Sequence, residues 1–416
     1  MTAAKPALPK TTHPFVYLFL ILPFGVTAGY LSVTVAYQLA KAGVGTVPIA
    51  ELIAISYIPH TWKFLWAPVV DTTLSRKLWY VIGALACAFG TYAIGVLPMT
   101  TASLPALTAI VLVSNVGATF LSMAVEALMA HATPDQEKGR AAGWFQAGNL
   151  GGVGLGGGAG LWLAEHVAIG WLPGAALGTV CALCCCGLLF VGEPHATHRR
   201  HGLAHNVLEV GRDLWTVARS RLGYLGLLIC FLPIGSGAAS NLWSAIAGDW
   251  QASADTVAMV NGVLGGLVSA AGCIVGGFIC DRIDRKHAYV LFGALMALCA
   301  IGMGLAPRTP ATYVGFVMLY AFVTGFAYAG FSAVVLEAIG TGAAATKYSL
   351  FASLSNMPIA YMTAINGMTH ARFGAANMLY IEAAIGFAAL MLFLAVARLS
   401  RRRQAGAAMN PAHGPV

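Results

Sequence analysis

Long apolar runs, each about as long as a helix that crosses a bilayer, recur along the whole chain of 416 residues. A spanning helix takes about 20 predominantly apolar residues because the hydrocarbon core is about 30 Å thick. Only 9% of the residues are charged and 58% are hydrophobic. That leaves too little charge to cover the surface of a water-soluble domain of this size. The sequence therefore predicts an all-α protein that crosses a membrane many times.

Twelve such runs fall into two groups of six. The longest polar stretch lies between the groups. It predicts a first half over 1–192, a cytoplasmic linker over 193–221 and a second half over 222–416 with a basic tail. Apolar residues at helical spacing in the linker fit either an amphipathic helix on the membrane surface or a solvated helix. We expect spans at 15–39, 49–66, 78–97, 104–130, 141–163 and 171–191, then at 223–247, 256–279, 288–306, 312–339, 348–369 and 375–397.

Lysine and arginine are distributed unevenly between the two sides that this topology defines. Nearly all lie on the side of the two termini, whereas Lys41, Arg308 and Arg372 lie on the other. Basic loops remain in the cytoplasm, so we expect both termini there and the chain in a bacterial inner membrane. The net charge of +8 is then a topology signal, and it predicts no nucleic-acid partner. The first run is too long for a signal peptide.

The two halves repeat each other at an offset of about 210 residues. Asp71 and Asp281 follow the second and eighth spans, and Glu126 and Glu337 end the fourth and tenth. Parallel repeats of this kind place the substrate path between the halves.

The sharpest local pattern is GFICDRIDRK at 277–286, after the eighth span. It resembles the loop signature of major facilitator proteins, and a degraded copy follows the second span at 67–77. A carboxylate and several cations at a helix junction can pair with acids and helix ends on neighbouring spans, which holds the cytoplasmic mouth shut. These charges fit a gate or only a topology signal. The expected gate residues are Asp71, Arg76, Lys77, Glu126, Arg140, Asp281, Arg282, Arg285, Lys286 and Glu337.

Glycines recur every fourth residue in the fifth span, at Gly148, Gly152, Gly156 and Gly160. A phosphate-binding loop would need a preceding strand and a following Lys-Ser/Thr, and the sequence has neither. Small residues at this spacing let two membrane helices approach closely. We therefore predict helix packing here, and likewise at Gly25/Gly29 and Gly272/Gly276.

Ionisable and amide side chains within the spans are costly unless they face protein or a water-filled path. Glu126 is the first candidate for proton coupling and His60 the second. Lys63 fits either an anion-binding role or snorkelling to the membrane surface, and carbonyls freed by Pro59 could satisfy His60 instead. Some of the amides are expected only to tie helices together. The expected pocket residues are Tyr30, Tyr37, Lys63, Gln146, Asn149, Asn241, Trp243, Tyr328, Asn356 and Tyr361.

All nine cysteines lie in apolar spans, and four of them crowd positions 181–186 without a nearby histidine or acid. They fit small apolar packing residues better than metal ligands. We expect no metal site, no cofactor and no disulfide framework.

The run KFLWAPVVD at 63–71 resembles the end of the second span in the AmpG-like muropeptide permeases, within the peptide and acetyl-coenzyme A transporter branch of the major facilitators. Stretches at 134–139, 156–165 and 346–355 support the resemblance. In the fourth span Ser122, Met129 and His131 occupy positions that are charged in those permeases. Those permeases also carry additional membrane segments beyond twelve.

The resemblance implies proton-coupled import of a medium-sized polar solute by alternating access, with protons and a small-molecule substrate as partners. Because the branch includes iron-siderophore permeases, the cargo is left open between a muropeptide-like and a siderophore-like solute. The alternative is a proton-antiport exporter of drugs or metabolites, although the span-five proline of such exporters is absent. No HExxH or GxSxG motif occurs in the spans, so we expect no enzyme. We expect a monomer.

Overall fold

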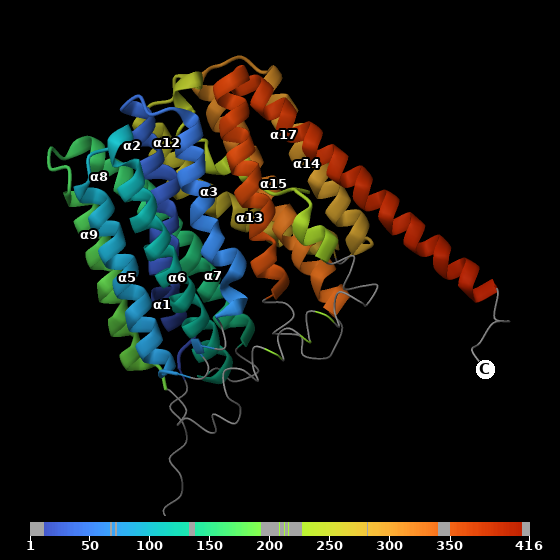
Figure 1. Cartoon of the computed structure of the whole chain (residues 1–416), viewed down its shortest axis with the longest axis horizontal. Helices are drawn as coiled ribbons and strands as arrows, with labels where there is room; N and C mark the ends of the chain where they lie inside the picture. Colours follow the sequence, from blue (N-terminus) through green and yellow to red (C-terminus); the bar gives the residue numbers. More distant parts are fainter. Residues whose placement is uncertain are drawn as a thin grey trace, which may run out of the picture.

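The computed structural model describes residues 12–66, 69–70, 73–132, 138–192, 208, 212, 215, 227–280, 282–339 and 350–409, with side chains left out at 130–132, 138–140, 142–143, 336–339 and 399–409. Among these residues the regular elements are helical and run back and forth between two ends (Figure 1). All but three positions of the expected linker lie outside the described residues.

The first half is built from α1 (Val16–Gly29), η1 (Tyr30–Val35), α2 (Ala36–Lys41), α3 (Thr46–Trp62), η2 (Lys63–Leu65), α5 (Arg76–Val96), η3 (Thr101–Ser103), α6 (Leu104–Ala132), α7 (Lys138–Gly154), η5 (Leu155–Ala159), α8 (Gly160–His166), α9 (Leu172–Leu183) and η6 (Cys184–Phe190). The second half is built from η7 (Ala238–Asn241), η8 (Ala247–Trp250), α12 (Ala254–Val257), η9 (Ala258–Leu264), α13 (Gly265–Cys280), α14 (Arg285–Leu305), α15 (Pro310–Ile339) and α17 (Asn356–Met409).

Eight helices among the described residues are long and apolar enough to cross a membrane. The remaining expected spans are not counted separately among these eight, for structural reasons. The second, α3, has 17 residues, and the fifth is the glycine-rich series α7, η5 and α8. The eleventh and twelfth are joined in α17, where Gly374 breaks the helix at φ 76 and ψ 175. This left-handed φ lets the chain reverse direction without steric cost, because glycine has no Cβ.

The seventh expected span, 223–247, is not a continuous helix, and this part of the prediction is wrong. The chain is helical at 227–231 and then turns through Pro233, Gly235 and Gly237. The two glycines have φ values of +61° and +69°, and a proline cannot continue a helix from its own amide. Irregular backbone at membrane depth is tolerated where protein buries it. Here the buried residues Ala238, Ala239 and Leu242 meet that condition.

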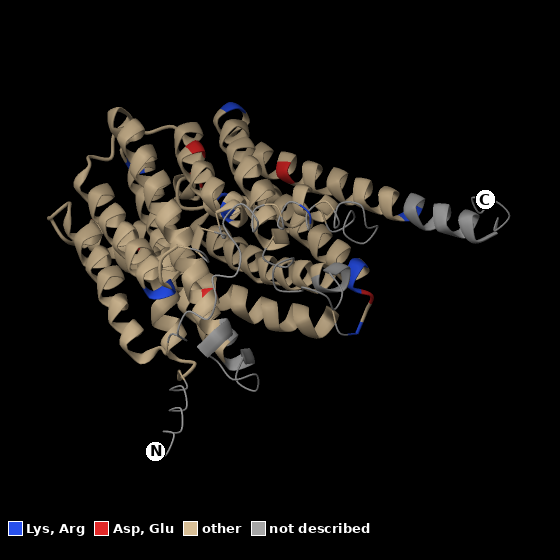
Figure 2. Ribbon diagram, turned by 60° about the horizontal axis from the view of Figure 1, so that its bottom comes forward, with Lys and Arg blue, Asp and Glu red and all other residues tan. Residues whose placement is uncertain are grey.

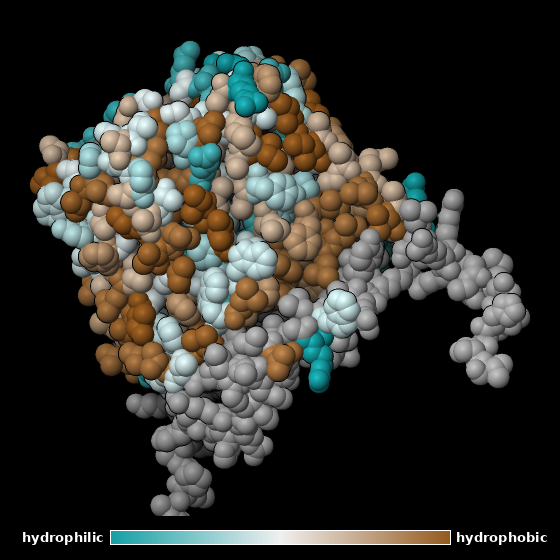
Figure 3. Space-filling view, in the orientation of Figure 1, coloured by the Kyte–Doolittle hydropathy of each residue, from teal (hydrophilic) through white to brown (hydrophobic). Residues whose placement is uncertain are grey.

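Apolar side chains cover the sides of the helix bundle. Phe89, Leu189, Leu267 and Met391 each expose more than 60% of their surface, and Figure 3 shows apolar residues over much of one face. Charged residues gather mainly near helix ends (Figure 2). This distribution is typical of a bundle that is surrounded by lipid.

The glycine pattern packs helices, as the sequence predicts. A Cβ at Gly152 would lie 2.5 Å from the Leu22 carbonyl oxygen and 2.9 Å from the Cα of Gly25, so α7 and α1 touch backbone to backbone. In the second half, a Cβ at Gly272 would lie 2.0 Å from the Phe322 carbonyl oxygen. The first and fifth spans therefore pair as the eighth and tenth do, and glycine permits both contacts.

Asp284 begins α14 as its N-cap: its carboxylate accepts hydrogen bonds from the backbone amides of Lys286 and His287 at 3.0 and 3.1 Å. Capping is therefore the role of this aspartate in the loop at 277–286. Partial burial alone would raise the pKa of Asp284, but these amides and the nearby His287 and Lys286 charges hold it below its ordinary value.

We expect Asp284→Ala to lower the free energy of unfolding by about 1 kcal/mol, since it removes the cap. Asp284→Asn keeps an acceptor and is the matched control. Because the folded pKa is the lower one, the contribution of Asp284 is present at neutral pH and fades as pH falls below about 4. Thermal unfolding of the three proteins at pH 7 checks this. Equal melting temperatures would refute the capping role.

Candidate functional site

The two halves meet along two seams. Along the first, α3 packs against α17, and a Cβ at Gly367 would lie 2.2 Å from the Ala50 Cβ. Along the second, the π-helical turn η5 packs against the π-helical turn η9, where a Cβ at Gly262 would lie 2.6 Å from the Gly158 Cα. π turns inside α-helices are frequent at functional sites. The contact between two of them makes the second seam a candidate functional region.

A hydrogen-bonded cluster joins the halves at the end opposite Arg76 and Arg285. His370 of α17 lies 2.6 Å from an Asp249 carboxylate oxygen through Nε2 and 2.7 Å from the Thr46 hydroxyl through Nδ1. If Nε2–H donates to the carboxylate, Nδ1 accepts from Thr46. We call Thr46, Asp249 and His370 the latch. At the same end His166 of α8 approaches Asp255 of α12 at 3.7 Å.

A second polar bridge crosses between the halves deeper in the bundle. The Tyr57 hydroxyl of α3 donates to Asn241 Oδ1 at 3.0 Å, and Asn241 Nδ2 donates to the Thr363 hydroxyl of α17 at 2.9 Å. Asn241 lies in the broken seventh span. The break thus places an amide where it binds both halves at once.

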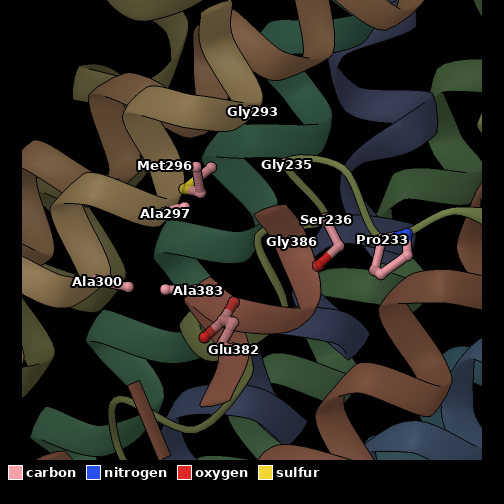
Figure 4. Close-up of a pocket in the computed structure, with 10 residues that line it drawn as sticks. All are labelled: Pro233, Gly235, Ser236, Gly293, Met296, Ala297, Ala300, Glu382, Ala383 and Gly386. Carbon is pink, nitrogen blue, oxygen red and sulfur yellow. The ribbon is translucent and has the colours of Figure 1, made fainter. Parts of the chain in front are cut away.

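Glu382 of α17 is a buried carboxylate with three donors. Its Oε1 accepts from the Tyr320 hydroxyl at 2.7 Å and from the Ala239 amide at 3.4 Å, while its Oε2 accepts from Asn366 Nδ2 at 3.2 Å. Only 8% of the residue is exposed. It lines a small cavity with Pro233 and other residues of the broken span and of α14 (Figure 4). All three donors are neutral, although a buried carboxylate is normally paired with a cation.

The first half holds its own polar track between α3 and α6. His60 Nε2 lies 3.0 Å from Asn115 Oδ1, and the His60 ring meets the Phe24 ring edge to face at 5.1 Å. One turn further along, Lys63 Nζ lies 3.3 Å from Glu126 Oε1, with 16% and 39% of the two side chains exposed. The structure therefore pairs Lys63 with Glu126 and places His60, which the sequence also selects, beside Asn115 of α6.

The expected gate residues are described only in part. Asp71 and Asp281 lie outside the described residues, as do the side chains of Arg140 and Glu337. Lys77 donates to the Leu188 carbonyl at 3.0 Å, a contact within the first half. At the end opposite the latch, Arg76 and Lys286 are half-buried, and Arg282 and Arg285 are exposed.

The expected pocket residues do not form one cluster. Asn241 and Trp243 lie in the broken span, and the Trp243 ring meets that of Tyr320 at 5.3 Å. Gln146 accepts from Asn149 at 3.4 Å. The remaining members lie elsewhere. Tyr30 is buried, Tyr37 is half-buried at the start of α2, and Tyr328 is half-exposed. Asn356 donates to the Ala352 and Ser353 carbonyls of its own chain segment, and Tyr361 donates to the Phe231 carbonyl.

Sequence reasoning missed Glu382 and the latch. The signal for Glu382 is present, since it is the one acid within the expected span 375–397, and an ionisable residue inside a span is a functional candidate by default. The latch has no local signal, because its three residues come from positions 46, 249 and 370.

Comparison with known proteins agrees with the helical fold. The anhydromuropeptide permease of Escherichia coli (strain K12) is 23% identical over 387 residues, which cover 90% of this chain and 76% of that protein. This confirms the resemblance carried by 63–71. Among solved structures, a D-xylose-proton symporter superposes with a TM-score of 0.70 at 15% identity, covering 91% of this chain and 96% of that one. The nucleoside transporter NupG gives 0.69 at 11% identity, with 92% and 98% covered.

The sequence also matches the family profile of the Major Facilitator Superfamily over residues 14–363. That match spans most of the chain, and the two solved transporters share its fold. This chain therefore belongs to the major facilitator superfamily of membrane transporters.

Proposed function

We propose that this protein is a proton-coupled importer that carries a medium-sized polar solute across the bacterial inner membrane by alternating access. The single observation that carries the proposal is the similarity to an anhydromuropeptide permease over 90% of the chain. The halves 1–192 and 222–416 move against each other about the solute, and both termini lie in the cytoplasm because the basic loops share their side.

The polar track of the first half supplies groups for coupling. Glu126 lies beside Lys63 at 3.3 Å, so protonating the carboxylate would remove the charge that holds the lysine. A freed Lys63 can then attract an anionic group of the solute. Ionisable side chains inside spans mark proton and substrate paths in transporters. Proton binding at Glu126 and solute binding at Lys63 are thereby linked.

The cargo class rests on the similarity to an anhydromuropeptide permease and on the polar side chains within the spans. An anhydromuropeptide carries sugar hydroxyls, peptide groups and carboxylates, which amides, tyrosines and one lysine can bind. A ferric siderophore has comparable size and polarity. The gate residues at the basic end, among them Lys77 and Arg285, close the cytoplasmic mouth when the outer mouth opens.

Uptake measurements test this proposal. Cells that express the protein should accumulate a radiolabelled anhydromuropeptide or a ferric siderophore, and a protonophore should abolish the accumulation. We expect Glu126→Gln to remove the dependence on the proton gradient, whereas Glu165→Gln, outside the track, should retain it. Uptake that a protonophore does not reduce, and that is unchanged in Glu126→Gln, would exclude this coupling role. Outward movement of the solute would favour an exporter.

A further inference from the structure

We propose that Glu382 is a second proton-binding site, and that its protonation state controls the position of the broken seventh span at the boundary between the halves. The proposal rests on the proposed function, since it adds a site to the same proton-coupled transport. It stands on the geometry around one carboxylate.

The position of Glu382 makes an ionised carboxylate costly. It lies in the span that α17 forms after Gly374, and 92% of its surface is covered. Charged groups at such positions are rare, and they neutralise or pair when they can. Its partners, Tyr320, Asn366 and the Ala239 amide, donate hydrogen bonds but bring no positive charge.

The surroundings of Glu382 contain few titratable groups in the described residues. Tyr320 faces it from α15, and Cys299 of α14 is close enough to feel its charge. The other contributors to the cavity wall are uncharged: Pro233, Gly235 and Ser236 from the broken span, Gly293, Met296, Ala297 and Ala300 from α14, and Ala383 and Gly386 from α17. A proton that enters this cavity therefore finds Glu382 as the strongest base.

Asn366 can accept a hydrogen bond from a protonated Glu382. This residue is fully buried, its Nδ2 donates to Glu382 Oε2, and its Oδ1 has no hydrogen-bond partner. A half-turn of the amide brings Oδ1 to Oε2. A proton on Oε2 then forms an O–H bond and donates to Oδ1, and the carboxylate charge changes from −1 to zero. Both protonation states thus have a hydrogen-bonded arrangement.

The cavity can hold a water molecule beside Glu382. The volume open to the centre of a water molecule is about 10 Å³, close to the minimum that one water needs. Figure 4 shows the Glu382 carboxyl near Ser236 of the broken span. A water bound there can donate a proton to Glu382 and, as hydroxide, must itself be reprotonated by another water that enters the cavity.

Protonation of Glu382 affects the boundary between the halves through Ala239 and Asn241. Ala239 donates to Glu382 Oε1, and two residues later Asn241 bonds both Tyr57 of the first half and Thr363 of the second. A neutral carboxyl is a weaker acceptor than a carboxylate, so protonation loosens Ala239. The bridge at Asn241 is then free to break when the halves move.

Infrared difference spectroscopy of the purified protein in lipid tests the site without any solute. A pH step should produce a band from a protonated carboxyl that is lost in Glu382→Gln and retained in Glu165→Gln, a matched control whose carboxylate is held by Lys41. If Glu382→Gln fails to fold, Tyr320→Phe serves instead. It removes a donor to the carboxylate, so the titration midpoint of the band should rise by about one to two pH units. A band unchanged in both variants would overturn the proposal.

Transport assays separate this proposal from the proposed function. If the wild type shows no proton-driven uptake of an anhydromuropeptide or a ferric siderophore, the proposed function fails, whatever the infrared result. If the wild type is proton-driven, we expect Glu382→Gln to reduce net accumulation at least tenfold while solute exchange across the membrane continues. Accumulation by Glu382→Gln at the wild-type level would contradict the role of Glu382 and leave the proposed function standing.

Discussion

Gly152→Ala will unfold at a clearly lower temperature than the wild type, whereas Gly151→Ala, one residue away on the same helix, will not. The added Cβ at Gly152 would lie 2.5 Å from the Leu22 carbonyl oxygen and 2.9 Å from backbone atoms of Gly25 and Val26. Backbone cannot yield as a flexible side chain can, so α1 and α7 must separate. Overpacking of this kind costs about 1–3 kcal/mol, occasionally more.

Gly151 is the matched control because nothing lies within 4 Å of its Cβ position. Replacing a helical glycine with alanine there should be neutral or stabilise by up to about 1 kcal/mol. Thermal unfolding in the same detergent compares the two variants directly. Equal melting temperatures would show that the backbone contact between α1 and α7 is absent.

His370→Ala will loosen the end of the molecule at which the latch lies. The change removes the contacts of His370 to Asp249 at 2.6 Å and to Thr46 at 2.7 Å. A hydrogen bond to a charged group contributes about 1.5–3 kcal/mol. Hydrogen–deuterium exchange of the first turns of α3 should then accelerate roughly ten- to a hundredfold, since each 1.4 kcal/mol is a factor of ten.

His287→Ala is the control for the latch. His287 also contacts an aspartate, Asp284 at 3.1 Å, but that pair lies within the first turn of α14 in the second half. Its loss should leave exchange in α3 unchanged. If His370→Ala and His287→Ala gave the same exchange in α3, the latch would not join the halves.

The sequence predicts the fold well wherever one helix carries its own signal. The glycines of the fifth span predict a close helix contact because their spacing alone places them on one face. The basic loops likewise predict which helix ends share a side. The seventh span shows the limit of this reasoning: hydropathy measures whether a segment can lie in lipid, and it does not register that Pro233, Gly235 and Gly237 break the helix.

The sequence allows only part of the candidate site to be selected, for a related reason. His60, Lys63 and Glu126 could be selected because each is polar within an apolar run, and the structure pairs Lys63 with Glu126 and His60 with Asn115. Their partners could not be predicted, since contacts between spans depend on the rotation of each helix. Asp249 and His370 meet only after the halves have packed, so no spacing along the chain reveals the latch.

The most direct test of proton-coupled transport uses purified protein in liposomes with an imposed pH gradient, acidic outside. With a radiolabelled anhydromuropeptide as solute, or a ferric siderophore in a parallel assay, we expect accumulation above the outside concentration that collapses when a protonophore is added. Glu126→Gln should only equilibrate the solute. Equilibration without accumulation by the wild-type protein, for both solutes, would contradict proton-coupled import.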